Sequence, residues 1–417
     1  MSKFVIKGGN RLNGELEIQT SKNATLPIMS ASIISSGKVR LNRVPHISDV
    51  DNMVNILSCL GATVERVGDS LTIDSSKAHN RHVNCELSKT MRSSVFLLGS
   101  MLARFKTATI NLPGGCKIGS RPIDIHVDAL KRLGVEVVDS GEIVYFDAVN
   151  AKAGKVRLKF ASVGATENII QFASTLKGKT TILNPAREPE IIDLCNFLNL
   201  MGAKIYGAGS NKITIYGVDK LYSATYTPIG DRIVSGTIMI AVALCGGKVK
   251  LNYAVPYQNL DLIEKLVQMG CQINYKNDII SIENNQSTDA LKRIKTACYP
   301  GFPTDLQSMM TVLSCVSNGE TTIDESIFEN RFLIVPELKK LGADITILSE
   351  HKIKVHGVSG LNGAVVKAMD LRGGASLVLA GLVAQGETVV EDIHYIDRGY
   401  EHLEHMLASL GADIIRI

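Results

Sequence analysis

A short motif recurs six times along this chain at a nearly constant interval. Leucine or methionine followed by glycine, and usually by alanine, occurs at 60–62, 133–135, 201–203, 269–271, 341–343 and 410–412. Successive glycines of this motif are 73, 68, 68, 72 and 69 residues apart. Repeats of about 70 residues are too long for the usual solenoid units, which have about 20 to 50 residues. The chain therefore contains six copies of one larger folding unit.

Each copy combines two helices with several strands. An amphipathic helix precedes the glycine, for example over 49–60, 190–201, 260–269 and 398–410, so the glycine falls just past a helix C-terminus. A second, more apolar helix ends in glycine and runs into a β-branched strand within 31–41, 242–251, 312–323 and 378–390. Turns at 67–70 and 208–211 separate the last two strands. The predicted unit is βαβαββ, with its apolar helix buried between sheets.

Six units divide most naturally into two similar α/β domains of three units each. The first domain is expected over 22–229 and the second over 230–417 together with 1–21. The chain would cross between them within Ser223–Gly230 and again near Thr20–Ser21. One strand over 3–18 would then close the second domain.

Composition limits the classes of function. Of the 417 residues, 45% are hydrophobic and 21% are charged, and the net charge is only +4. Without tryptophan or basic clusters, the chain gives no case for nucleic-acid binding. It shows no apolar run of signal-peptide or membrane-span length, so a cytoplasmic protein without membrane insertion is expected. The eight cysteines form no C-x-x-C pair, and Cys59, Cys195, Cys245 and Cys315 lie in apolar helical patterns, where a thiol acts as a small hydrophobic group.

The loop 112–122 places one cysteine among three glycines and two prolines. Lys117 and Arg121 flank Cys116, and nearby positive charge favours a reactive thiolate. Such a loop suits a lid over an anionic substrate. The alternative is a surface turn with a stray cysteine.

Charged and polar residues gather where the apolar helices begin, at 21–24, 89–93, 231–232, 303–305 and 370–372. Helix N-termini carry partial positive charge, so several of them together would attract an anion. Asp305 could be a helix cap or a general base, and the residues alone do not separate these roles. His402 and His405 share a helix face, but no third zinc ligand is expected beside them.

Seven motifs together identify a family. They lie at 21–24, 113–122 (Pro-Gly-Gly-Cys-x-Ile-Gly-x-Arg-Pro), 162–166, 187–190, 302–305, 328–332 and 396–401. In this order they resemble the motifs of the UDP-N-acetylglucosamine 1-carboxyvinyltransferase family of enolpyruvyl transferases, essentially end to end. The resemblance implies two inside-out α/β domains of three βαβαββ units, with the active site in the cleft between them and neither a cofactor nor a metal ion.

The resemblance also implies a reaction and its residues. The 3-hydroxyl of UDP-N-acetylglucosamine adds to C2 of phosphoenolpyruvate and phosphate leaves, the first committed step of peptidoglycan synthesis. Cys116 would donate the proton to C3 and could hold phosphoenolpyruvate as an adduct, and Asp305 would be the base. Groups similar to those that bind phosphoenolpyruvate are Lys22, Asn23, Arg121 and Arg398, with Arg331 and Arg372 nearby; groups similar to the nucleotide-sugar contacts are Arg92, Arg121, Pro122, Ile123, Asp124, Ile125, Ser162, Val163, Gly164, Asp305 and Ile327.

One position departs from the family pattern. Some members carry a lysine two residues before the 162–166 motif, and this chain has Phe160 there, beside Lys159. A charged contact to the nucleotide sugar is therefore in question. Cys116 itself is the common form and implies alkylation by fosfomycin.

Two other readings stay open at this point. The sister enzyme that acts on shikimate 3-phosphate shares the architecture, although Cys116 and the run Arg121–Asp124 favour the UDP-sugar. A non-catalytic repeat protein that binds an anionic partner is a different class, in which Cys116 would be dispensable. The sequence leaves the oligomeric state undetermined.

Overall fold

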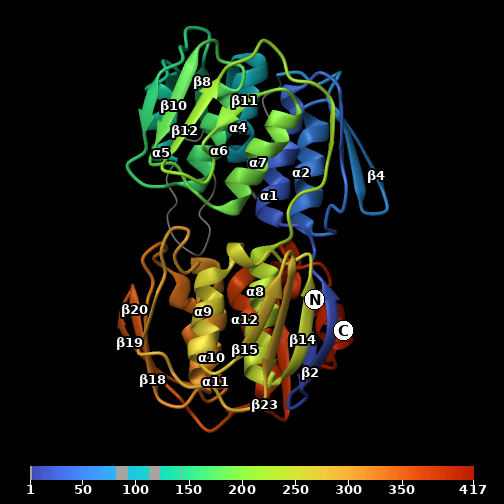
Figure 1. Cartoon of the computed structure of the whole chain (residues 1–417), viewed down its shortest axis with the longest axis vertical. Coiled ribbons are helices and arrows are strands. Elements are labelled where there is room, and N and C mark those ends of the chain that lie inside the picture. The colour runs from blue at the N-terminus through green and yellow to red at the C-terminus, as the bar shows by residue number, and fades with distance from the viewer. Residues whose placement is uncertain (1, 81–92, 112–122, 142) are drawn as a thin grey trace. The chain divides into compact units, whose positions relative to one another are not determined.

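The computed structural model describes residues 2–80, 93–111, 123–141 and 143–417 (Figure 1). The chain divides into two compact units. The C-terminal unit contains residues 2–19 and 230–417, and the N-terminal unit contains the described residues from 20 to 229. Each unit has its own hydrophobic core, one including Phe4 and Leu379 and the other Phe146 and Phe197.

Three four-stranded sheets form the outside of the C-terminal unit. Their orders are β15-β16-β14-β2, β17-β18-β20-β19 and β22-β24-β1-β25. The strands are β1 (Phe4–Lys7), β2 (Leu12–Glu17), β14 (Gly247–Asn252), β15 (Gln272–Lys276), β16 (Ile279–Asn284), β17 (Arg293–Lys295), β18 (Glu320–Asp324), β19 (Asp344–Ser349), β20 (Lys352–His356), β22 (Val365–Lys367), β24 (Glu387–Glu391) and β25 (Asp413–Arg416), with a short pair β21 (Leu361–Asn362) and β23 (Ala384–Gln385).

The N-terminal unit follows the same plan. Its sheets have the orders β13-β3-β5-β4, β11-β12-β10-β9 and, among the described residues, β6-β8-β7. The strands are β3 (Lys38–Leu41), β4 (Thr63–Val67), β5 (Ser70–Asp74), β6 (Thr107–Asn111), β7 (Glu136–Asp139), β8 (Ile143–Asp147), β9 (Lys155–Arg157), β10 (Lys179–Leu183), β11 (Lys204–Tyr206), β12 (Lys212–Tyr216) and β13 (Ala224–Tyr226). In every four-stranded sheet one pair of neighbouring strands is parallel and the other pairs are antiparallel. For example, β9 is parallel to β10, whereas β10 is antiparallel to β12. The predicted repeat of α/β units is confirmed.

Apolar helices fill the inside of each unit. In the C-terminal unit α8 (Arg232–Cys245), α10 (Gln307–Cys315) and α12 (Leu371–Val383) pack against one another and are buried on nearly all faces (Figure 1). In the N-terminal unit α4 (Ser93–Phe105) packs on α1 (Lys22–Ala31) and α6 (Val163–Ala173). The amphipathic helices are α2 (Ser48–Cys59), α5 (Asp124–Lys131), α7 (Pro189–Leu200), α9 (Leu260–Gln268), α11 (Val335–Lys340) and α13 (Leu403–Ser409).

The six motif glycines explain why the repeat is visible in the sequence. All of them follow the amphipathic helices and have positive φ, between 83° and 106°. Residues with a side chain rarely adopt this backbone conformation, whereas glycine does so without strain. Each glycine thus ends its helix and lets the chain turn into the next strand.

Two local expectations were wrong. The segment 3–18 forms two strands, β1 and β2, because Gly8 and Gly9 interrupt it: Gly9 has φ +102°, and a Cβ on Gly8 would lie 2.4 Å from the carbonyl oxygen of Ala384. The helix expected over 398–410 begins only at Leu403, since His402 has φ +48° and a 3₁₀ segment, η5 (Ile393–Arg398), precedes it.

In each unit the first and last strands pair with each other. Strand β1 lies between β24 and β25 and is antiparallel to both, so the N-terminus supplies the fourth strand of the last sheet. In the same way β13 pairs in parallel with β3, the strand that follows the first apolar helix. No helix among the described residues is long and apolar enough to cross a membrane.

Candidate active site

Asp305 lies in a 3₁₀ turn, η3 (Thr304–Leu306), immediately before α10. The residues at the N-cap positions of η3 and α10, Pro303 and Leu306, make no side-chain cap hydrogen bond. Instead the carboxylate accepts from two guanidinium groups: Arg331 Nη2 lies 2.6 Å from Oδ1, and Arg372 Nη2 lies 3.2 Å from Oδ2. The sequence left two roles open for Asp305, a helix cap or a general base. The geometry disfavours the helix cap.

The two arginines approach Asp305 from separate elements. Arg331 begins η4 (Arg331–Ile334), and Arg372 stands in the first turn of α12. They are 4% and 3% exposed, whereas the side chain of Asp305 is 25% exposed. Two buried guanidinium groups therefore contact one partly accessible carboxylate.

Aromatic rings and hydroxyl groups fix both guanidinium planes. Arg331 lies 5.2 Å from the centre of the Phe328 ring, and its Nε donates to Thr304 Oγ1 at 3.2 Å. Arg372 lies 5.4 Å from the Tyr400 ring, and the Tyr400 hydroxyl is 2.9 Å from Thr237 Oγ1. Stacking on aromatic faces is favourable for guanidinium groups and leaves their edges available for forked contacts.

Both guanidinium groups keep one unmatched nitrogen. Nη1 of Arg331 and Nη1 of Arg372 are buried and have no hydrogen-bond partner among the described residues. A buried donor without a partner costs about 1–3 kcal/mol, and more when it is charged. Burial alone lowers the pKa of Arg372, but nearby Tyr400 and the carboxylates of Asp305 and Asp231 raise it overall, so the group stays charged. Together these features describe a site prepared for a phosphate or carboxylate ligand.

Two further expected residues lie on the same unit. Arg398 is the last residue of η5, is partly buried, and η5 packs against α12, the helix of Arg372. Ile327 is half-buried in the loop after β18, and its backbone N–H donates to Glu325 Oε1 at 2.8 Å.

The N-terminal unit holds a second group of expected residues. Lys22 and Asn23 form the first turn of α1, whose cap is the Ser21 hydroxyl, and Lys22 Nζ lies 3.2 Å from Asp49 Oδ2. Both members of this ion pair are largely buried, with side chains 12% and 4% exposed. Asp49 was not expected from the sequence, although an acidic residue in the first turn of α2 is a signal that could have indicated it.

The helices α5 and α6 bring a third group together. Ile123, Asp124 and Ile125 begin α5, and Ser162, Val163 and Gly164 begin α6, with the Ser162 hydroxyl as its cap. The helices pack closely, since Asn168 Nδ2 lies 2.8 Å from His126 Nδ1 and a Cβ on Gly164 would lie 3.0 Å from the His126 ring. Two neighbouring helix N-termini favour an anionic ligand such as a diphosphate. Arg92, Cys116, Arg121 and Pro122 lie outside the described residues.

Buried cysteines and one buried glutamate of the two units have raised pKa values. Burial raises the pKa of the Cys195, Cys245 and Cys315 thiols to about 12, as expected of thiols within apolar helices. Cys59, by contrast, is exposed at the last position of α2, so the interpretation of its thiol as a small hydrophobic group in an apolar pattern was wrong. Burial, with Glu190 and Glu188 nearby, raises the pKa of Glu167 well above its usual range.

The histidine pair also differs from expectation. Glu404 lies beside His402 and His405, and one possible ligand atom from each falls within 4.8 Å of the others, so the expected absence of a third group was wrong. Arg416 already binds the Glu404 carboxylate through Nε at 2.8 Å and Nη2 at 3.3 Å. This pairing neutralises the one charged ligand of the cluster.

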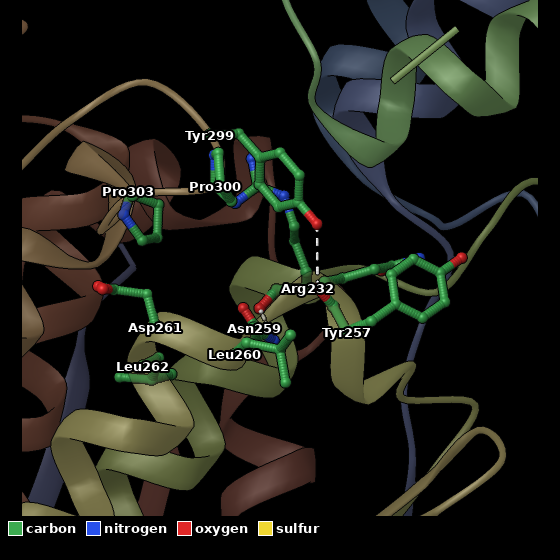
Figure 2. A pocket seen from close by; sticks show the side chains of 11 residues that line it. Arg232, Tyr257, Asn259, Leu260, Asp261, Leu262, Tyr299, Pro300 and Pro303 are labelled. Carbon is green, nitrogen blue, oxygen red and sulfur yellow. Dashed lines mark hydrogen bonds between the residues drawn. The ribbon is translucent and has the colours of Figure 1, made fainter. Parts of the chain in front are cut away.

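A small cavity lies beside the loop that leads to Asp305. Figure 2 shows Tyr299 above Arg232, with its hydroxyl donating to the Tyr257 carbonyl at 3.0 Å. Arg232 lies 5.8 Å from the centre of the Tyr299 ring, and the cavity has a volume of about 10 Å³. This volume admits at most one water molecule, so the cavity is part of the loop's anchorage and not a substrate pocket.

Comparison with known proteins places this geometry in context. The family model described as EPSP synthase (3-phosphoshikimate 1-carboxyvinyltransferase) matches residues 6–407. Proteins named UDP-N-acetylglucosamine 1-carboxyvinyltransferase from Caldanaerobacter subterraneus subsp. tengcongensis (number 2 of that name) and Halothermothrix orenii are each 45% identical over 417 residues, which is all of this chain and all of each relative.

Solved structures are similar over the same length. The enolpyruvyl transferase NikO from Streptomyces tendae has a TM-score of 0.88 at 25% identity and covers 100% of this chain and 99% of its own. EPSP synthase from Acinetobacter baumannii has a TM-score of 0.77 at 17% identity with complete coverage of both chains, a likeness of fold alone.

Proposed function

The chain belongs to the carboxyvinyl (enolpyruvyl) transferase family, and on that premise we propose that it transfers the enolpyruvyl group of phosphoenolpyruvate to the 3-hydroxyl of UDP-N-acetylglucosamine. Relatives of that name are 45% identical over the full length, whereas the EPSP synthase structure is 17% identical. These values favour the nucleotide sugar over shikimate 3-phosphate. The product is the first committed intermediate of peptidoglycan synthesis.

The observation that carries the proposal is the pair of buried guanidinium groups around Asp305. Phosphoenolpyruvate has a phosphate and a carboxylate, and the unmatched Nη1 donors of Arg331 and Arg372 suit such an anion. Arg398, Lys22, Asn23 and, from the sequence, Arg121 complete the proposed phosphoenolpyruvate site. Fixed positive charge of this kind also stabilises the charge that moves onto phosphate as it leaves.

The reaction needs one base and one acid. Asp305 takes the proton from the 3-hydroxyl while the sugar oxygen forms its bond to C2, and Cys116 gives a proton to C3. The resulting tetrahedral adduct returns a proton from C3 to the Cys116 thiolate and expels phosphate from C2, which restores the double bond. Protons and electrons balance without an oxidant or reductant.

The nucleotide sugar is assigned to the N-terminal ends of α5 and α6 and to residues near the base. Its proposed contacts are Arg92, Arg121, Pro122, Ile123, Asp124, Ile125, Ser162, Val163, Gly164, Asp305 and Ile327. The mechanism requires that residues of both units act on one pair of substrates. We propose that the reaction takes place in the cytoplasm. The free thiols of Cys195, Cys245, Cys271 and Cys315 fit a reducing compartment.

Phosphate release tests the assignment directly. The purified protein should release phosphate from phosphoenolpyruvate with UDP-N-acetylglucosamine and not with shikimate 3-phosphate. Asp305→Asn and Cys116→Ala should each abolish this release. Release with shikimate 3-phosphate alone would transfer the assignment to the sister enzyme, and no release with either acceptor would favour a non-catalytic binding protein.

A further inference from the structure

We propose that Glu325 is a positioning residue that holds Arg331 in register with Asp305. The inference rests on the proposed function, in which Asp305 is the base and Arg331 binds phosphoenolpyruvate. Glu325 follows β18 directly and is 1% exposed. A carboxylate buried this completely must be fully hydrogen-bonded if it is not to destabilise the fold.

The Glu325 carboxylate meets this requirement by joining three segments. Its Oε1 accepts from the Thr296 hydroxyl at 2.9 Å and from the backbone N–H groups of Ile327 and Phe328 at 2.8 and 3.1 Å. Its Oε2 accepts from the Thr304 hydroxyl at 2.9 Å. One side chain thus ties the end of β17, the turn that carries Asp305 and the loop that leads to Arg331.

The backbone of Glu325 is fixed as well. Its N–H donates to the His351 carbonyl at 2.9 Å, and His351 Nδ1 lies 3.1 Å from the Glu325 carbonyl oxygen. The carboxylate therefore projects from an anchored point, and its position can determine that of its partners.

The first route from Glu325 to Arg331 passes through Thr304. A threonine hydroxyl has one proton, and here it is donated to Glu325, so its lone pairs are left for Arg331 Nε at 3.2 Å. Because the guanidinium group is planar, fixing Nε also fixes Nη2, which lies 2.6 Å from Asp305 Oδ1. The orientation of one hydroxyl thereby sets the ion pair of the base.

The second route passes through Phe328. Its backbone N–H is bound by Glu325, and its ring lies 5.2 Å from the centre of the Arg331 guanidinium group. Glu325 therefore controls both the edge and the face of that group.

The Thr304 contact can be removed without disturbing the rest. Thr304→Val keeps the shape of the side chain and leaves the other three bonds of Glu325 intact, and Thr304→Ser keeps the hydroxyl. We expect Thr304→Val to lower kcat about 10- to 100-fold and to raise the KM for phosphoenolpyruvate several-fold, since small misplacements of reacting groups have effects of about this size. Thr304→Ser should restore both values to within about threefold of wild type.

Glu325→Gln provides an independent perturbation. The amide can keep Oε1 for the Ile327 and Phe328 N–H groups, but its NH₂ replaces the acceptor that Thr304 needs, so the hydroxyl must turn. If Glu325 acts through Thr304, Glu325→Gln should lower kcat strongly in the wild-type background and much less in the Thr304→Val background. A double-mutant cycle measures this difference.

A neighbouring carboxylate supplies the matched control. The Asp324 carboxylate pairs with Arg293 and, at 3.2 Å, with Lys352, and among the described residues it forms no hydrogen bond with Thr304 or Arg331. Asp324→Asn should keep wild-type KM values. Loss of folded enzyme would lower the apparent kcat and leave KM unchanged, so the KM for phosphoenolpyruvate separates positioning from mere stability.

Each outcome has a distinct meaning. A wild-type protein without acceptor-dependent phosphate release would refute the proposed function itself. If the wild type is active, two results would overturn the positioning role of Glu325 and leave the proposed function standing. One is equal kinetics for Thr304→Val and Thr304→Ser, and the other is additive effects of Glu325→Gln and Thr304→Val.

Discussion

The buried carboxyl group of Asp193 makes the stability of the N-terminal unit depend on pH. Asp193 lies in α7 and is 1% exposed. It accepts from the Tyr226 hydroxyl at 2.6 Å and from the Ile229 N–H at 3.2 Å, and so ties α7 to the segment where the chain leaves this unit. Burial raises the pKa of Asp193 from 3.8 to about 6, although these two hydrogen bonds lower it, and Glu190 raises it further.

The magnitude follows from the two pKa values. The folded state holds the proton more tightly than the unfolded state, so the stabilisation is fully present below about pH 4 and is lost as the pH rises through about 6. A shift of about two units corresponds to about 3 kcal/mol of unfolding free energy. Asp193→Asn cannot ionise and should lack this dependence, apart from a constant offset of about 1 kcal/mol for one lost hydrogen bond.

The neighbouring thiol of Cys195 gives a local assay. Cys195 is buried in the same helix, so its labelling after equilibration in urea reports the opening of α7 when the labelled peptide is quantified by mass spectrometry. All labelling pulses are made at one common pH. The difference in unfolding free energy between wild type and Asp193→Asn should change by about 2 kcal/mol between pH 4 and pH 7, because the carboxyl group of the unfolded chain is already partly ionised at pH 4.

A matched variant tests the cause of the shift. Tyr226→Phe removes the hydrogen bond that favours the ionised form, so the pKa of Asp193 should rise further and the fall in stability should extend to higher pH. Parallel curves for wild type and Asp193→Asn from pH 4 to 7 would refute the reasoning.

The remaining predictions concern the proposed reaction. Arg372→Lys keeps the charge but loses the forked contact and the stacking on Tyr400, so kcat/KM for phosphoenolpyruvate should fall at least about 10-fold in steady-state assays. Fosfomycin should inactivate the enzyme by alkylating Cys116, so mass spectrometry should find one fosfomycin adduct on the peptide that contains Cys116. The Cys116→Ala variant should stay unmodified. Phe160→Lys should lower the KM for UDP-N-acetylglucosamine, because Phe160 is 43% exposed and a lysine there could reach a phosphate; an unchanged or higher KM would count against that contact.

The helices and most strands could be predicted because the signals are local. The positive-φ glycine after each amphipathic helix and the apolar run before each strand are properties of adjacent residues, and they recur six times. The start of α13 could not be predicted in this way. The apolar spacing continues through 398–410, whereas residues 399–402, which end in the left-handed backbone of His402, separate η5 from the helix.

The residues that hold the site together were harder to predict than those that would touch substrate. Glu325 reaches Thr296 and Thr304, which lie 29 and 21 residues earlier in the chain. No periodicity relates positions at these separations, because the fold of the C-terminal unit alone brings them together. Motifs indicated Asp305 and Arg331, while the acceptor that orients their contacts carried no local signal.

The apolar helices of the C-terminal unit use the acidic residues at their entrances in two different ways. At the entrances of α8 and α12, Asp231 and Asp370 each accept from two backbone N–H groups, and such a cap typically stabilises a helix by about 1 kcal/mol. At the corresponding entrance of α10, the 3₁₀ turn displaces Asp305 from the capping position, and its carboxylate meets Arg331 and Arg372 instead. Because α10 is buried between α8 and α12 and keeps its place through packing, it can lose that cap without losing the fold. Of these three acidic residues, the one that does not cap a helix is the one that we assign as the base.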